Sequence, residues 1–192
     1  MEIYLLRHTK PDVPPDTCYG QSDIDVVEQP FRNQLPKFQK LLPLENISAI
    51  YTSPLQRCYK LAENLSNKHQ DAIVDERIGE LDFGEWELQP WSSINPRHLA
   101  RWKEDFLFAQ APGGESHMDL YQRVEQFWDQ LLKKEHPTSL IVTHGGVIKS
   151  LLSKILDMPL RKSYAFKIHY GELIYISIQD NAIRQMEFMI GR

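Results

Sequence analysis

The sequence has few cysteines and no long hydrophobic run. Its two cysteines, Cys18 and Cys58, are too few for the disulfide framework of a small secreted protein, so we expect reduced thiols. A membrane-spanning helix needs about 18–20 consecutive apolar residues, and no stretch of the chain reaches that length. Residues 1–7 also lack the basic start and the long apolar core of a signal peptide. These absences predict a cytoplasmic location and no membrane segment.

A run of basic residues is missing as well. The chain has 22 Lys and Arg against 26 Asp and Glu, which gives a net charge of -4. Because the phosphate backbones of nucleic acids are bound by clustered Lys and Arg, we expect no nucleic-acid partner. A small anionic ligand is compatible with this composition, since it needs only a local positive pocket.

What is present is a typical globular composition, with 42% apolar and 25% charged residues. A length of 192 residues fits one domain, so we expect a single domain over residues 1–192 with one hydrophobic core. Short apolar runs alternate along this chain with amphipathic segments. The runs that predict strands are residues 3–6, 48–52, 72–74 and 139–143.

Helices are expected between these strands. One covers residues 28–42, with a break or kink near Pro36, and another begins with Ser53 as N-cap and Pro54 at the first position. A third helix is expected at residues 95–106. A fourth runs from a capping box of Ser116 and Asp119 to Glu135, and its inward face is formed by Tyr121, Val124, Trp128 and Leu131. A fifth follows a turn at Gly145–Gly146. Three further runs, at residues 164–168, 173–178 and 183–188, predict an antiparallel edge. Together they indicate an α/β fold, a three-layer α/β/α sandwich with a mostly parallel sheet.

Three of the expected strands deliver polar residues to one edge of this sheet. Arg7 and His8 follow the first strand, Arg57 lies in the first turn of the helix after the second, and His144 follows residues 139–143. Ligands of open α/β sheets bind beyond the carboxyl ends of the strands, so we expect these side chains to meet there. Two guanidinium groups and two helix N-termini are suited to binding a phosphoryl group.

The two histidines suggest how that group reacts. A neutral imidazole can attack phosphorus, so we predict that His8 carries the phosphoryl group as a covalent phospho-histidine and that His144 helps to bind it. The leaving oxygen then needs a proton, for which we select Glu80. The rings of Phe83 and Trp86 could keep water from this carboxyl and favour its protonated form.

These residues also have structural interpretations. Arg57 could pair with Glu63 or Asp75 on the surface, and Glu80 belongs to an acidic run of the kind that usually forms a solvated face. Three tryptophans are expected to be packing residues: Trp86, Trp91 and Trp102. Trp91 could also line a substrate pocket. Five histidines show no metal-ligand spacing and are expected at the surface or in the core: His69, His98, His117, His136 and His169. No metal or other cofactor is predicted.

The motifs resemble those of the histidine phosphatase superfamily, in its phosphoglycerate-mutase-like branch. Leu6-Arg7-His8-Thr9 resembles the nucleophile signature, residues 53–57 the second-arginine segment and residues 142–146 the second-histidine segment, in the family's order. Residues 112–116, Pro-Gly-Gly-Glu-Ser, match a further landmark. The resemblance implies that His8 accepts the phosphoryl group, that Arg7, Arg57 and His144 bind it, that Glu80 protonates the leaving group, and that no metal is required.

The resemblance extends to the substrate. Residues 19–24 are similar to the family's substrate loop, which makes Gly20 and Gln21 candidate substrate contacts. The compact length, residues 19–21, residues 112–116 and residues 169–171 most resemble those members that hydrolyse α-ribazole 5′-phosphate, in the lower-ligand branch of cobalamin synthesis. The implied function is hydrolysis of a small phosphate ester.

Three other functions stay open. They are phosphoglycerate mutation, broad-specificity hydrolysis of sugar or nucleotide phosphates, and binding of a phosphorylated ligand without catalysis, which the presence of His8, Glu80 and both arginines disfavours. The polar loop residues of mutases are absent after His8, which favours hydrolysis. Two positions depart from the family pattern: Leu88 stands where glycine is common, and Lys149 stands where arginine is common. The sequence predicts no oligomeric state.

Overall fold

The computed structural model describes residues 1–66, 71–134, 136–180 and 182–190, and its framework is one six-stranded sheet. The strand order is β3-β2-β4-β1-β5-β6. The neighbours from β3 to β1 run parallel, while β5 pairs antiparallel with β1, and β6 pairs antiparallel with β5. The strand bounds are β1 Glu2–Arg7, β2 Ala49–Thr52, β3 Ile73–Val74, β4 Thr138–Thr143, β5 Leu173–Gln179 and β6 Ala182–Ile190. The predicted mixed sheet is therefore confirmed, with two antiparallel strands at its edge.

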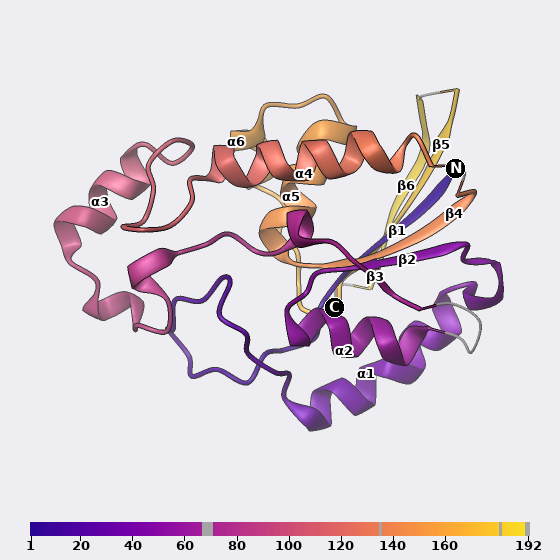
Figure 1. The fold of residues 1–192 in the computed structure, drawn as a ribbon, viewed down its shortest axis with the longest axis horizontal. Coiled ribbons are helices and arrows are strands. Elements are labelled where there is room, and N and C mark those ends of the chain that lie inside the picture. The colour runs from indigo at the N-terminus through magenta and orange to yellow at the C-terminus, as the bar shows by residue number, and fades with distance from the viewer. Residues whose placement is uncertain (67–70, 135, 181, 191–192) are drawn as a thin grey trace.

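Helices cover both faces of the sheet, which completes the three predicted layers (Figure 1). Helices α1 and α2 lie on one face, α4 and α5 lie on the other, and α3 lies at one end of the molecule, away from the sheet (Figure 1). The bounds are α1 Glu28–Leu41, α2 Gln56–Leu65, α3 Pro96–Glu104, α4 His117–Leu131, α5 Gly145–Ile155 and α6 Leu160–Ser163. None of the described helices is long and apolar enough to cross a membrane.

The sheet separates the apolar interior into two clusters. Successive side chains of a strand point to opposite faces, so Ile3 and Leu5 of β1 pack with α4 and α5, whereas Tyr4 and Leu6 pack with α1 and α2. The expectation of one core was therefore wrong. A third, smaller cluster, built around Trp86, lies outside these two layers.

Several predicted boundaries differ from those observed. Residues 53 and 54 precede α2, which begins at Gln56 with Leu55 as its N-cap, and the Ser53 hydroxyl lies 2.7 Å from His144 Nε2. Gly145 and Gly146 are the first residues of α5 and not a separate turn. Pro36 lies inside α1 without breaking it, and residues 164–168 form no strand.

Helix α4 confirms one expectation and corrects another. Ser116 and Asp119 form the predicted capping box. The helix ends at Leu131, whereas the predicted end, Glu135, lies outside the described residues. Its buried face is formed by Leu120, Val124, Phe127, Trp128 and Leu131, and Tyr121 is only half-buried, since it lies one position off that stripe.

Leu88 has a backbone conformation that favours glycine. Its φ is +63°, in the left-handed region, where a Cβ atom is crowded by the backbone. The conformation is held by a hydrogen bond from the Leu88 N–H to the Cys18 carbonyl, at 2.8 Å. The side chain is 59% exposed, so little burial offsets the strain.

We predict that Leu88→Gly raises the free energy of unfolding, by up to about 1 kcal/mol, because relief of the left-handed strain exceeds the entropy cost of glycine. Urea denaturation measures the change. The control is Leu132→Gly at another exposed leucine, whose φ is -63°, and this variant should be destabilised. Equal destabilisation of both variants would contradict the argument.

Candidate active site

The predicted site residues meet at the carboxyl ends of β1 and β4. His8 directly follows β1 and is 1% exposed, and His144 directly follows β4 and is fully buried. The parallel pairing of the two strands sets Arg7 opposite Thr143, and the His8 N–H donates to the Thr143 carbonyl at 3.0 Å. The two imidazole rings consequently lie edge to face, with centroids 5.1 Å apart.

The ring of His8 is oriented by its own backbone neighbour. Its Nδ1 lies 2.7 Å from the carbonyl oxygen of Thr9. A carbonyl only accepts hydrogen bonds, so Nδ1 carries the proton, and in the neutral ring the lone pair lies on Nε2. This geometry gives the nucleophilic nitrogen a defined position.

The surroundings of His8 favour its neutral form. Burial lowers the pKa of His8 well below its usual value, and the positive charges of Arg7 and Arg57 add to the effect, against a smaller opposing contribution from the bond to Thr9. Burial, followed by the charge of Arg57, also lowers the pKa of His144. Both imidazoles are therefore neutral at neutral pH.

Two arginines provide the positive charge. Arg7 donates through a terminal nitrogen to the Ile168 carbonyl at 2.7 Å, and the buried Arg57 donates to the carbonyls of Ser22, at 2.7 Å, and Gly20. The Nε atoms of both arginines are buried and have no hydrogen-bond partner among the described residues. The surface pairing of Arg57 with Glu63 or Asp75 is thus excluded. The two Nε–H groups remain as donors that suit an anion.

The loop that carries Gly20 and Gln21 is fixed by Glu87. This carboxylate accepts hydrogen bonds from the backbone N–H groups of Gly20, Gln21 and Ser22 and from the Ser22 hydroxyl. Burial opposes the ionised form, but these bonds lower the pKa of Glu87 overall. The loop is thereby held where its carbonyls reach Arg57. Sequence reasoning missed Glu87, since the loop that it holds lies more than sixty residues away.

Gly20 and Gln21 differ from the expectation of direct substrate contacts. A Cβ atom at Gly20 would lie 1.8 Å from the Leu81 carbonyl oxygen, so glycine is needed for this close approach. Gln21 is exposed, and neither residue lines the pocket described next. Their observed contacts are with Arg57 and Glu87.

Glu80 faces a pocket of about 280 Å³ beside the arginine and histidine cluster. Its carboxylate oxygens accept from the N–H groups of Leu81, at 3.0 Å, and Gly146, at 3.2 Å. Gly146 allows this contact, because a Cβ atom there would lie 2.3 Å from Glu80 Oε1. The lining residues are Arg7, Thr17, Tyr19, Glu80, Leu81, Phe83, Trp91, His117, Gly145, Gly146, Lys149, Tyr164 and Ile168.

The pocket corrects the expected environment of Glu80. Phe83 and Trp91 line it as predicted, but Trp86 is buried in the small cluster with Cys18, Ile94 and Ala111. Lys149 faces the same pocket, with Nζ 4.8 Å from the centre of the Tyr164 ring. The departure from arginine at this position therefore places a compact ammonium group in the pocket.

Arg123 holds the segment that carries Glu80. Its guanidinium donates to the carbonyls of Arg77, Gly79 and Glu80 and pairs with Glu115 at 2.8 Å. The Pro-Gly-Gly-Glu-Ser motif contains this Glu115, and Arg123 lies two helical turns further on. Sequence reasoning missed Arg123, which resembled any polar residue of an amphipathic helix.

The N-terminus of α2 differs from the predicted anion site. The Gln56 N–H, at the start of this helix, donates to the Asp23 carboxylate at 2.7 Å, so a protein side chain already occupies that position. The N-terminus of α5 faces the pocket through Gly145 and Gly146. The Gly146 N–H also has a protein partner, the Glu80 carboxylate at 3.2 Å.

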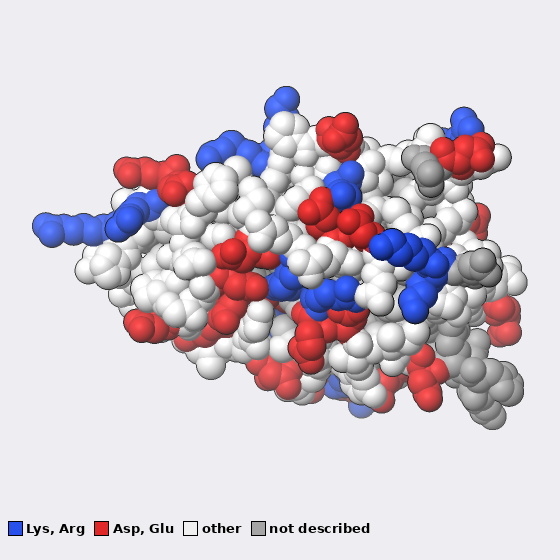
Figure 2. Space-filling view, turned by 45° about the horizontal axis from the view of Figure 1, so that its top comes forward, with Lys and Arg blue, Asp and Glu red and all other residues white. Residues whose placement is uncertain are grey.

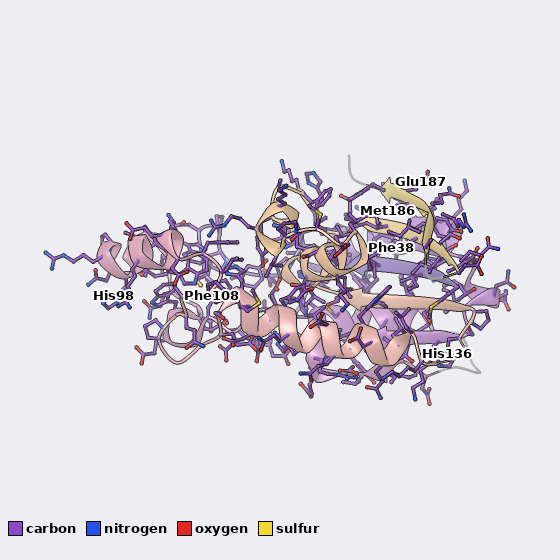
Figure 3. The ribbon with its side chains drawn as sticks, turned by 90° about the horizontal axis from the view of Figure 1, so that it is seen from above. Phe38, His98, Phe108, His136, Met186 and Glu187 are labelled. Atoms are coloured by element: carbon purple, nitrogen blue, oxygen red, sulfur yellow. The ribbon has the colours of Figure 1, made fainter. Side chains whose placement is uncertain are left out.

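The remaining histidines lie outside the cluster of Arg7, His8, Arg57 and His144. His98 on α3 and His136 before β4 lie toward opposite ends of the molecule (Figure 3). His169 is exposed, His117 is buried at the pocket wall, and His69 lies outside the described residues. Within the described ranges, no group of three or more His, Cys, Asp or Glu is placed to hold a metal ion.

Charges of both signs are interspersed on one face of the molecule. On the face shown in Figure 2, Lys and Arg alternate with Asp and Glu without an extended patch of one sign. The two arginines of the site are instead half-buried or buried. The concentrated positive charge is thus local, as a small anionic ligand requires.

A family model described as the histidine phosphatase superfamily (branch 1) matches residues 3–189. The chain belongs to the histidine phosphatase superfamily. Phosphoserine phosphatase 1 of Hydrogenobacter thermophilus is 28% identical over 172 residues, which cover 86% of this chain and 81% of that protein. The adenosylcobalamin/alpha-ribazole phosphatase of Escherichia coli is 24% identical over 176 residues, which cover 89% and 87%.

Two solved phosphatase structures share the fold. The alpha-ribazole phosphatase from Shigella flexneri superposes with a TM-score of 0.86 at 23% identity, covering 95% of this chain and 93% of that one. A mycobacterial glucosyl-3-phosphoglycerate phosphatase gives 0.81 at 25% identity, covering 97% of both chains. The protein is thus a phosphatase of the histidine phosphatase superfamily, and its relatives carry the names of different substrates.

Proposed function

We propose that the protein hydrolyses a small phosphate monoester through a phospho-histidine on His8, without a metal ion. The observation that supports this most strongly is the hydrogen bond from His8 Nδ1 to Thr9, which leaves Nε2 as the nucleophilic atom of a neutral ring. Arg7, Arg57 and His144 surround this ring and bind the phosphoryl oxygens. The single domain over residues 1–192 and the cytoplasmic location stay predictions from the sequence.

The first step transfers the phosphoryl group to the enzyme. The Nε2 lone pair of His8 attacks phosphorus, and a P–N bond forms while the P–O ester bond breaks. The electron pair of the broken bond goes to the leaving oxygen, which takes a proton from the Glu80 carboxyl group. The guanidinium groups of Arg7 and Arg57 stabilise the charge on the phosphoryl oxygens.

The second step returns the enzyme to its starting state. Glu80, now a carboxylate, accepts a proton from a water molecule whose oxygen attacks phosphorus. The P–N bond breaks, inorganic phosphate leaves, and the electron pair returns to Nε2. One carboxyl group thus serves as acid and then as base.

We propose α-ribazole 5′-phosphate as the substrate. The relatives named for this substrate and the resemblance of residues 19–21 and 169–171 support the choice. The aromatic rings of Phe83, Trp91 and Tyr164 in the pocket wall suit a flat heterocyclic leaving group. Mutase activity and broad-specificity hydrolysis are the alternatives.

We predict that His8→Ala lowers hydrolysis of p-nitrophenyl phosphate by about 10⁴-fold or more, because the covalent route is lost. EDTA should leave the wild-type rate unchanged. The matched control is His98→Ala, at an exposed histidine on α3, which should retain full activity (Figure 3). Activity that survives in His8→Ala, or that requires added metal, would show that the mechanism is wrong.

A second prediction concerns the proton donor. Glu80→Gln should lower the rate on an alkyl phosphate by about 10²–10⁴-fold and on p-nitrophenyl phosphate much less, since nitrophenolate leaves without protonation. Gly146→Ala should show the same pattern, because its Cβ would displace the Glu80 carboxylate. Glu85→Gln, at an exposed position of the same acidic run, is the control. Equal losses on both esters would argue against Glu80 as the acid.

A third prediction concerns the leaving group. We expect kcat/KM to be highest for α-ribazole 5′-phosphate in a panel that also contains phosphoserine, 3-phosphoglycerate and sugar and nucleotide monophosphates, with release of inorganic phosphate measured for each. Phosphoryl exchange on 3-phosphoglycerate without free phosphate would instead identify a mutase. Similar values across the panel would identify a broad-specificity phosphatase.

A further inference from the structure

Three of the four phosphoryl-binding groups are shut away from solvent, and the fourth, Arg7, lines the pocket that holds Glu80. His8, Arg57 and His144 are each 1% exposed or less, and none of the three lines the pocket that holds Glu80. The Nε atoms of Arg7 and Arg57 are buried without a partner in the part of the chain that the structure describes. Unpaired buried donors are unfavourable, and an incoming anion would pair with them.

Two tyrosines lie across this closed site. The hydroxyl oxygens of Tyr19 and Tyr170 are 2.6 Å apart and share a hydrogen bond. The Tyr170 ring packs on the Arg7 guanidinium at 4.1 Å and lies 5.6 Å from the His8 ring, while the Tyr19 ring lies 5.5 Å from the Arg57 guanidinium. Each tyrosine ring therefore lies over one of the two arginines, and the hydrogen bond joins the two rings through their hydroxyl groups.

The backbone on either side of this pair is anchored. The Cys18 N–H donates to the Gln89 carbonyl and the Gly20 N–H to Glu87, which fixes the segment around Tyr19. The Gly171 N–H donates to the His8 carbonyl at 3.1 Å, which fixes the segment around Tyr170. An opening of the site would therefore involve rotation of the two side chains rather than movement of a loop.

The exposure of the pair is consistent with such a rotation. Tyr170 is 39% exposed and Tyr19 lines the pocket of Glu80, so both rings lie between solvent and the buried groups. Burial, with the hydrogen bond to Tyr170 as the next cause, raises the pKa of Tyr19. The hydroxyl of Tyr19 consequently stays protonated and able to donate at neutral pH.

We propose that Tyr19 and Tyr170 form a hydrogen-bonded gate over Arg7, His8 and Arg57, which must open before a phosphoryl group can enter. The inference rests on the proposed function of these residues in binding phosphate. A ligand that binds only the open state has an apparent Kd that is raised by the scarcity of that state. Removal of the hydrogen bond between the hydroxyls therefore increases the open population and tightens binding.

The test is the affinity for inorganic phosphate, measured by isothermal titration calorimetry on the full chain. Tyr19→Phe and Tyr170→Phe keep the rings over the arginines but remove the bond, and each should bind phosphate roughly 3- to 10-fold more tightly than the wild type. Because the two variants lose the same bond, the double variant should bind no more tightly than either single variant.

The control and the contradicting results separate a gate from other roles. Tyr175→Phe loses a tyrosine hydrogen bond to Glu2 on the sheet and should leave the affinity unchanged. Weaker binding in Tyr19→Phe and Tyr170→Phe would mean that the hydroxyls hold phosphate directly, and additive effects would mean that they act separately; either result overturns the gate. Unchanged affinity, or no phosphate binding in any variant, overturns it too.

This measurement involves no turnover, so it is independent of the covalent mechanism. If His8→Ala kept its activity while the tyrosine variants bound phosphate more tightly, the proposed mechanism would fail and the gate would stand. If His8→Ala lost activity and phosphate affinity did not respond to the tyrosine substitutions, only the gate would fail.

Discussion

The hydrogen bond from His8 Nδ1 to the Thr9 carbonyl is the interaction on which the site depends. It fixes the tautomer, so that the lone pair lies on Nε2, and it uses only the backbone of the next residue. Burial among positive charges then keeps the ring neutral. The same charges that bind a phosphoryl group therefore also keep the nucleophile in its reactive form.

The sheet and its loops supply the rest of this arrangement. The parallel pairing of β1 with β4 brings His8 and His144 together, and the antiparallel pairing of β5 with β1 places Tyr170 close to His8. Glu87 and Arg123 act indirectly. Glu87 binds the loop whose carbonyls accept from Arg57, and Arg123 binds the backbone of Glu80. Charged groups outside the site thus fix those inside it.

The parts that sequence reasoning predicted are those with a local signal. Arg7, His8 and His144 directly follow buried strands, so their meeting at one sheet edge follows from the parallel order, and the family resemblance is confirmed. Boundaries failed where side chains make tertiary contacts, as at Ser53, whose hydroxyl lies 2.7 Å from His144 Nε2 while Leu55 is the N-cap of α2. The contact of Tyr19 with Tyr170 joins positions 151 residues apart and has no local pattern.

The most direct test of the account is the identity of the phosphorylated atom. The protein is labelled with ¹⁵N on histidine, mixed rapidly with a phosphate ester, quenched in base and examined by ³¹P and ¹⁵N nuclear magnetic resonance. The account predicts one phospho-histidine, on Nε2 of His8, with the Nδ1 signal unmodified. Phosphorylation on Nδ1, phosphorylation on another residue, or turnover without any phospho-enzyme would contradict it.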